Sequence, residues 1–303
     1  MTSTLNRLAS SALSVAAIAM IACADNGGQA PLPPSLPPPP PPPSGENIPP
    51  ITGSPAAVQD IGTFQSAILG NTRRLWVYIP PGYTANPTAR YPVLYVHDGQ
   101  TAFSPMNFDD EATRVIQAME ARPIIIVAVE STSDRYNEYM PFVDHNGKGG
   151  KGELYSQMLI TELKPYIDSR YRTLTDAAHT GTTGQSAGGV ITWWLALEHP
   201  DHFNLMAAQS APLQLGSSGS QPLVTKVHNL PSKLPDRIWF DRGTSDGEDW
   251  QRQAEQVMRQ ELIAKGWVDG VDLRYVLVAG GTHSTGNWSQ RVGEILKFLF
   301  PRS

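Results

Sequence analysis

Two patterns of apolar and polar residues alternate from about residue 51 to the end of the chain. Short runs rich in β-branched and aromatic residues predict strands, and several are apolar throughout, which is typical of strands covered by helices on both faces. The predicted strands are residues 74–79, 92–96, 124–129, 180–184, 205–209, 238–240 and 273–278. Amphipathic stretches predict helices at 109–121, at 154–171 with a kink at Pro165, and at 249–265 before Gly266.

This alternation of strands and helices predicts one α/β domain over residues 51–303. Repeated strand–helix units favour a mostly parallel central sheet with helices packed on both faces. We therefore expect a doubly wound three-layer sandwich, in which functional groups gather at the carboxyl ends of the strands.

The first 50 residues have a different character. An apolar run at 8–22 follows Arg7 and is too short to span a bilayer as a helix, so residues 1–22 predict a secretory signal peptide. Cys23 follows directly, in a context that resembles the lipobox of bacterial lipoproteins. Residues 24–50 are rich in proline, with seven consecutive prolines at 37–43, and predict a disordered linker.

The predicted location follows from these segments. We expect a protein exported to the bacterial periplasm or outer membrane and held at the membrane by a lipid on Cys23. An ordinary signal peptide with an incidental cysteine is the alternative, and it would give a secreted protein.

Charge and cysteine content exclude several classes of protein. The chain has 23 Lys and Arg against 28 Asp and Glu, a net charge of −5, and no basic block, which argues against a nucleic-acid partner. Its single cysteine cannot form an internal disulfide, and the clusters of His and Cys that hold structural zinc are missing from the sequence. We predict no metal and no cofactor.

The sharpest local motif is Gly184-Gln185-Ser186-Ala187-Gly188, which follows a predicted strand and precedes an apolar helical stretch. Strand, tight turn and helix are the context of a nucleophile elbow, in which small residues let the serine hydroxyl project above the sheet. Ser186 is therefore the predicted nucleophile. A structural turn with an inert serine is the alternative.

A serine nucleophile needs a base, and four histidines follow Ser186. His199 ends the predicted helix, His202 lies in a turn, and His228 lies in a polar loop. His283 differs, because it follows the last predicted strand on a glycine-containing loop at the edge where catalytic groups gather. We predict His283 as the base.

The acid should lie between these two residues, at another strand end. The candidates are Asp241, Asp246, Glu248 and Asp249. Asp249 is a predicted helix N-cap, and Asp241 is expected to pair with a neighbouring arginine, Arg242 or Arg237. Asp246 lies in a turn and is the preferred acid, with Asp241 and Asp249 left as alternatives.

A tetrahedral intermediate also needs two backbone N–H donors. The elbow supplies the Ala187 amide. The turn after the predicted strand 92–96 supplies the second, from Gln100 with Gly99 close behind. A tight turn that only closes the strand is the alternative.

Six segments together resemble the Putative esterase family of α/β-hydrolases, which includes esterase D, enterochelin-type siderophore esterases, feruloyl esterases and mycolyltransferases. The segments are YPVLYVHDGQ at 91–100, IIIVAVESTSDRYNEYMP at 124–141, LITELKPYIDSRYRT at 159–173, HTGTTGQSAGG at 179–189, DRGTSD at 241–246 and GGTHSTGNWSQR at 280–291. The resemblance implies the triad Ser186, His283 and Asp246.

The resemblance extends to residues around the triad. It implies oxyanion donors at Gln100 and Ala187, a substrate-binding role for Arg135 and Trp288, and a bracing role for Glu138 and Arg291. Many relatives have glutamate where this chain has Thr285 and Asp246, and the second of these changes keeps a carboxylate.

The function that follows is hydrolysis of a carboxylic ester through an acyl-enzyme. The expected partner is a small-molecule ester, such as a siderophore, an acylated sugar or a phenolic ester. Acyl transfer on the same scaffold is one alternative, and a non-catalytic envelope lipoprotein that binds a ligand is another.

Overall fold

The computed structural model of the protein describes residues 48–144, 146–214, 220–247 and 249–302. The predicted signal peptide, Cys23, Glu248 and nearly all of the predicted linker lie outside these residues.

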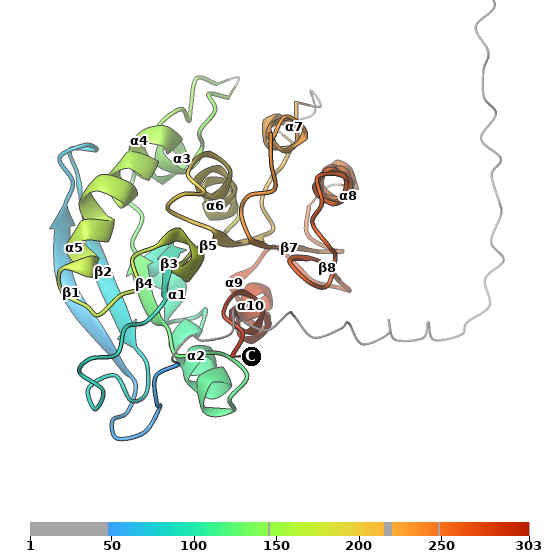
Figure 1. The fold of residues 1–303 in the computed structure, drawn as a ribbon. Helices are drawn as coiled ribbons and strands as arrows, with labels where there is room; N and C mark the ends of the chain where they lie inside the picture. The colour runs from blue at the N-terminus through green and yellow to red at the C-terminus, as the bar shows by residue number, and fades with distance from the viewer. Residues whose placement is uncertain (1–47, 145, 215–219, 248, 303) are drawn as a thin grey trace, which may run out of the picture. The chain divides into compact units, whose positions relative to one another are not determined.

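An eight-stranded sheet forms the centre of the molecule, in the order β1-β2-β4-β3-β5-β6-β7-β8 (Figure 1). Strands from β4 to β8 run parallel, whereas β2 is antiparallel to both β1 and β4. The strands are β1 (Ala57–Gln65), β2 (Thr72–Ile79), β3 (Val93–His97), β4 (Ile125–Val129), β5 (Thr180–Gln185), β6 (Leu205–Gln209), β7 (Arg237–Gly243) and β8 (Leu273–Val278). The prediction of a mostly parallel α/β sheet is confirmed.

Helices cover both faces of the sheet, so that two apolar cores form. One core packs against α4 (Gly152–Gln157), α6 (Ala187–Glu198), α7 (Pro222–His228) and α8 (Asp249–Ala264). The other packs against α2 (Phe108–Gln117) and α10 (Val292–Leu299), on the opposite face in Figure 1. Every residue of β3 to β6 is buried, which explains why these strands lack alternation.

Four shorter helices complete the fold. They are α1 (Gly99–Ala102), α3 (Arg135–Tyr139), α5 (Lys164–Asp168) and α9 (Thr285–Ser289), together with the π-helix η1 (Met158–Leu163) and the 3-10 helix η2 (Ala177–His179). Three of them, α1, α3 and α9, follow strands and carry residues of the candidate site. None of the helices in the described ranges has the length and hydropathy needed to cross a bilayer.

The predicted helices differ from the observed ones in several details. The predicted helix 154–171 is divided into α4, the π-helix η1 and α5, and Pro165 lies in the first turn of α5, where proline requires no intrahelical N–H bond. The helix predicted at 109–121 ends at Gln117, before Met119 at φ 62°. The placement of His228 in a loop was wrong, because it is the last residue of α7.

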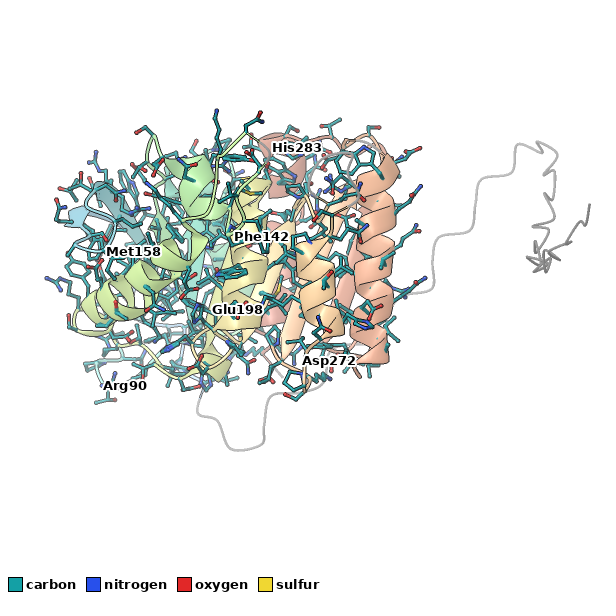
Figure 2. The ribbon with its side chains drawn as sticks, turned by 90° about the horizontal axis from the view of Figure 1, so that it is seen from above. Arg90, Phe142, Met158, Glu198, Asp272 and His283 are labelled. Carbon is teal, nitrogen blue, oxygen red and sulfur yellow. The ribbon has the colours of Figure 1, made fainter. Side chains whose placement is uncertain are left out.

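The carboxyl ends of the parallel strands lie at one edge of the sheet. Figure 2 shows His283, which follows β8, at that edge, and shows Arg90 and Asp272, which precede β3 and β8, at the other. Ser186 follows β5, and Asp98 follows β3, so the topology alone places these residues at the same edge as His283.

Candidate active site

Ser186 lies between β5 and α6 in a strained conformation, with φ 56° and ψ −125°. Such backbone geometry costs a non-glycine residue about 1–3 kcal/mol and persists only where neighbours enforce it. The turn closes tightly, because a Cβ on Gly184 would lie 2.5 Å from the carbonyl oxygen of Gly188. The Ser186 N–H donates to the carbonyl oxygen of Gln209 at 2.9 Å. Two features therefore allow and hold the sharp bend: the close approach of Gly184 to Gly188, and the hydrogen bond from Ser186 to β6.

His283 stands on the loop between β8 and α9, with 45% of its side chain exposed. Its Nδ1 lies 2.7 Å from Oδ1 of Asp246. An ionised carboxylate only accepts hydrogen bonds, so Nδ1 carries the proton and Nε2 of the neutral ring has a free lone pair. This is the tautomer that a general base needs.

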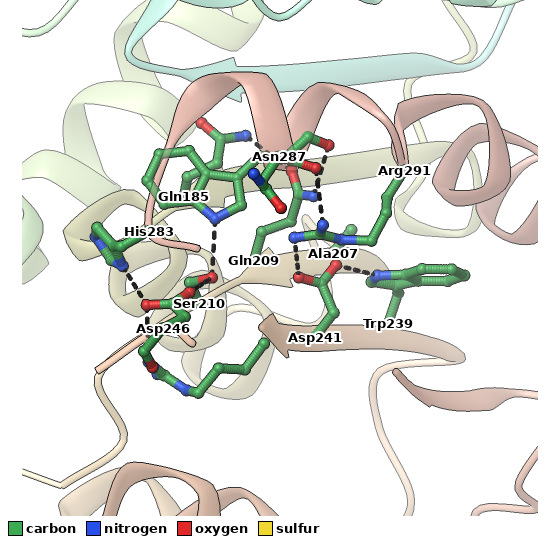
Figure 3. A network of polar contacts seen from close by, with 12 residues as sticks. Gln185, Ala207, Gln209, Ser210, Trp239, Asp241, Asp246, His283, Asn287 and Arg291 are labelled. Carbon is green, nitrogen blue, oxygen red and sulfur yellow. Dashed lines mark hydrogen bonds and ion pairs between the residues drawn. The ribbon is translucent and has the colours of Figure 1, made fainter. Parts of the chain in front are cut away.

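Asp246 is buried, with 1% of its side chain exposed, and both of its carboxylate oxygens are occupied. Oδ1 receives the bond from His283, and Oδ2 accepts from the hydroxyl of Ser210 (Figure 3). Burial alone raises the pKa of Asp246, but the bonds from His283 and Ser210, with the charge of Arg242 at 3.5 Å, hold that pKa below its usual value. The carboxylate is thus ionised at neutral pH.

Ser210 was not predicted from the sequence. It directly follows β6, has φ 53°, and accepts a hydrogen bond from Nε1 of Trp288 at 2.8 Å. The indole N–H is only a donor, so the Ser210 hydroxyl must give its own proton to Asp246. Nothing in the local pattern around Ser210 marks it, because its partners come from two distant parts of the chain.

The two alternative acids lie away from the imidazole. Asp241 is buried at the end of β7, accepts from Arg291 at 2.8 Å and from the indole N–H of Trp239 at 2.8 Å (Figure 3). The expected pairing of Asp241 with Arg242 or Arg237 was therefore wrong. Asp249 is exposed, is the first residue of α8 and pairs with Arg252.

A cleft of about 310 Å³ opens above these residues. Ser186, His283, Gln100, Arg135 and Trp288 all line it. Among the described residues, no hydrogen bond joins the Ser186 hydroxyl to the imidazole, although both face this one cleft. Hydrogen bonds in unliganded active sites are often long and tighten when substrate binds.

The two predicted oxyanion donors are the first residue of α6, Ala187, and the second of α1, Gln100. The first amides of a helix have no intrahelical partner, so both N–H groups are available to an anion. The side chain of Gln100 is fixed by Ser131, which accepts from Nε2 at 2.8 Å and donates its N–H to Oε1 at 3.1 Å. A Cβ on Gly99 would lie 2.6 Å from the backbone nitrogen of Val129, so this turn is packed directly against β4.

Arg135 reaches the cleft through an ion pair with Asp98, the residue that begins the Gln100 turn. Its Nε and Nη2 bind the two carboxylate oxygens of Asp98 at 2.6 and 2.7 Å. Burial lowers the pKa of Arg135, but the bonds to Asp98 outweigh burial and raise it. Asp98 has φ 58°, and its N–H donates to the hydroxyl of Tyr139 at 3.1 Å. The guanidinium thus supports the turn as well as lining the cleft.

Of the remaining residues implied by the resemblance, Glu138 and Arg291 form ion pairs within the protein and Trp288 lines the cleft. Glu138 is fully buried and pairs with Arg73 at 3.2 Å. Arg291 pairs with Asp241 as described above. Trp288 packs edge-to-face on the His283 ring, with centroids 4.8 Å apart, so it touches the imidazole directly.

Four of the other described histidines have partners away from the cleft. His199 contacts Glu153 at 3.0 Å, His202 lies 3.5 Å from Asp201, and His228 contacts Glu261 at 2.9 Å. His97 lies beneath the Gln100 turn, fully buried between the hydroxyls of Tyr155 and Thr182 at 3.0 and 2.9 Å. Burial lowers the pKa of His97 to about 3. No group of three or more His, Cys, Asp or Glu suited to hold a metal occurs in the part of the chain that the structure describes.

The fold and this cleft define the chain as an α/β-hydrolase. The profile of the family described as "Putative esterase" matches residues 66–299, so the chain belongs to that esterase family and is a carboxylic ester hydrolase by class. The apo-salmochelin esterase of Escherichia coli O6:H1 is 28% identical over 176 residues, which are 52% of this chain and 52% of that protein.

Solved structures show the same fold. A ferulic acid esterase superposes with a TM-score of 0.66 at 22% identity and covers 82% of this chain and 98% of its own. The enterobactin esterase FES from Shigella flexneri superposes with a TM-score of 0.65 at 20% identity and covers 83% of this chain and 61% of its own.

Proposed function

We propose that this protein is an exported serine esterase that hydrolyses its substrate through an acyl-enzyme formed on Ser186. The observation that carries the proposal is one cleft in which a serine on a strained elbow faces an imidazole whose second nitrogen is held by a buried carboxylate. Membership of an esterase family supports the same chemistry.

In the first step the Ser186 oxygen attacks the ester carbonyl carbon, and Nε2 of His283 takes the hydroxyl proton. The Ala187 and Gln100 N–H groups stabilise the negative charge that develops on the carbonyl oxygen. Asp246 stabilises the imidazolium, which then gives the proton to the departing alcohol. Water, deprotonated by the same imidazole, attacks the acyl-enzyme, releases the acid and restores Ser186.

Substitution of the nucleophile tests this mechanism directly. Ser186→Ala should abolish hydrolysis of p-nitrophenyl acetate and labelling by a fluorophosphonate probe, with a loss of about 10⁴-fold or more in kcat. Ser289→Ala, in α9, removes a hydroxyl that bonds only the local carbonyl oxygen of Gly286 and serves as the control. Retained turnover in Ser186→Ala would refute the assignment.

The natural ester is to be found by a substrate screen. Three similar proteins are named for salmochelin, ferulic acid and enterobactin. The screen should therefore begin with siderophore and phenolic esters, with acylated sugars beside them. Product analysis with and without an alcohol acceptor would separate hydrolysis from acyl transfer.

Export and membrane attachment are proposed from the sequence of residues 1–50. A lipid on Cys23 would anchor the esterase, and the proline-rich segment that follows would act as a spacer. Metabolic labelling with an alkynyl fatty acid should mark the full-length protein and fail to mark Cys23→Ser. A labelled Cys23→Ser variant would contradict the anchor.

A further inference from the structure

A second hollow, of about 210 Å³, lies beside the Gln100 turn on the side away from Ser186. Its walls come from the β1–β2 hairpin, from α1 and from the residue that follows β4. The side chains that give it its chemistry are Val58, Trp76, Phe103 and Glu130.

Gln100 lies between this hollow and the catalytic cleft, because it lines both. Its side chain is held by the two hydrogen bonds to Ser131, so the boundary between the two hollows is a fixed one. In the proposed mechanism the substrate carbonyl oxygen binds the Gln100 N–H. A substituent of that ester that extends past Gln100 would therefore enter the second hollow.

The surface of the hollow is mostly apolar, although Glu130 is among its walls, and the Trp76 side chain is held in place. Val58 is 38% exposed on the edge strand, although valine is a residue that is usually buried. The Trp76 indole N–H donates to Oε1 of Glu130 at 2.9 Å, which fixes the ring and satisfies its single donor. Arg74 covers the Trp76 ring, with its guanidinium carbon 4.9 Å from the ring centroid. A ligand would therefore meet aromatic and aliphatic surface that has no need to rearrange.

We propose that this hollow is a second subsite of the esterase and takes an apolar group, of the size of one aromatic ring, carried by the ester substrate. The inference rests on the proposed function. Small-molecule sites combine apolar surface with a small number of placed polar groups, and the second hollow would supply apolar surface beside the polar catalytic cleft. The apolar group can belong to the acyl or to the alcohol side of the ester, since the carbonyl carbon has one of each.

Two variants test the subsite without altering the catalytic residues. Phe103→Ala removes one wall, and Val58→Asp places a charge in the hollow at an exposed position. Val257→Asp is the matched control, because Val257 is 39% exposed on α8 and lies outside the hollow. Circular dichroism and turnover of ethyl acetate, which carries no ring on either side, establish that each variant is folded and active.

Kinetics are then measured on two pairs of esters. The acyl pair is ethyl acetate and ethyl hydrocinnamate, and the alcohol pair is ethyl acetate and benzyl acetate. In one of the two pairs, both variants should lower kcat/KM for the aromatic member about 10-fold, while kcat/KM for ethyl acetate stays close to the wild-type value. The Val257→Asp control should keep wild-type kcat/KM for both members of each pair.

The outcomes separate the two proposals. An unchanged preference for the aromatic member in both pairs, with normal acetate turnover, overturns the subsite and leaves the esterase assignment intact. A wild-type protein that hydrolyses none of the esters overturns the proposed function, and the subsite with it.

Discussion

The Ser210 hydroxyl donates a hydrogen bond to Oδ2 of Asp246, on the oxygen that His283 does not use. Trp288 fixes the direction of that bond, because its indole N–H donates to the Ser210 oxygen and leaves the hydroxyl proton of Ser210 for Asp246. The acid of the proposed triad is thus held from both sides, and the second support comes from a residue on a neighbouring strand end.

Loss of the Ser210 hydroxyl should weaken catalysis while leaving the fold intact. Hydrogen bonds to charged groups contribute about 1.5–3 kcal/mol, so Ser210→Ala should lower kcat about 10-fold. Without the second donor, the Asp246 charge acts more strongly on the imidazolium, so the acidic limb of the kcat/KM profile should move to higher pH. Steady-state kinetics between pH 5 and 9 measure both effects.

Ser210→Gly controls for backbone strain in this experiment. Glycine accepts the positive φ of this position without cost, whereas alanine does not. Both variants should lose activity equally if the hydroxyl is responsible. A glycine variant with wild-type kcat would show that strain, and no hydrogen bond, accounts for the alanine result.

The choice among the acids can be tested by matched amide substitutions. Asp246→Asn should reduce kcat by about 10³–10⁴-fold, because the imidazole loses the partner that fixes its tautomer. Asp241→Asn should instead destabilise the protein by about 3–5 kcal/mol, since it leaves the buried Arg291 charge unpaired. Asp249→Asn should alter neither quantity. Urea denaturation beside kcat measurements distinguishes the three, and a kcat collapse confined to Asp241→Asn would reverse the assignment.

Arg135 should act through the Gln100 turn. Arg135→Met removes the two bonds to Asp98, which loosens the turn that holds one proposed oxyanion donor, and kcat should fall about 10-fold or more with KM changed less than about threefold. Arg135→Lys keeps the charge and one bond and should be intermediate. An increase in KM at constant kcat would indicate a direct substrate contact, as the family resemblance implies.

Glu255 should make stability fall between about pH 4.5 and pH 8. Burial raises its pKa to about 8, and the neighbouring Arg242 at 2.8 Å, shared with Asp246, offsets only part of that rise. The folded state therefore holds a proton that the unfolded chain has released in this window, so stability decreases as pH rises. Glu255→Gln imitates the protonated form and should remove the decrease. Thermal unfolding of the wild type and of Glu255→Gln at pH 6 and pH 9 measures the decrease. An equal change in Tm between the two pH values in both proteins would contradict the role of Glu255.

The central strands were predictable because their environment is uniform. β4 and β6 are buried along their whole length, so five successive buried positions appear in each as an apolar run. β1 escaped prediction because it is the edge strand, mostly exposed, and paired only with β2. Its polar residues are exposed to solvent, so the strand lacks the alternation of apolar and polar residues that would predict it.

The placement of a candidate site residue was predictable where one local motif contains the residue and its context. Ser186 has its strand, turn and helix within a few residues, and His283 has its strand and loop. Ser210 and the pairing of Arg135 with Asp98 depend on segments that are 36 or more residues apart, and such contacts exist only after the sheet has assembled. Sequence patterns of strands and helices contain no information about these bonds.

The buried His97 has a consequence for the electric field beneath the proposed nucleophile. Its pKa of about 3 leaves the ring uncharged from weakly acidic to alkaline solution, so the potential under the Gln100 turn stays constant while the medium changes. An imidazole with an ordinary pKa at the same place would add a positive charge near the oxyanion donors on mild acidification. The protein thereby separates the proton chemistry of its cleft from the scaffold beneath it.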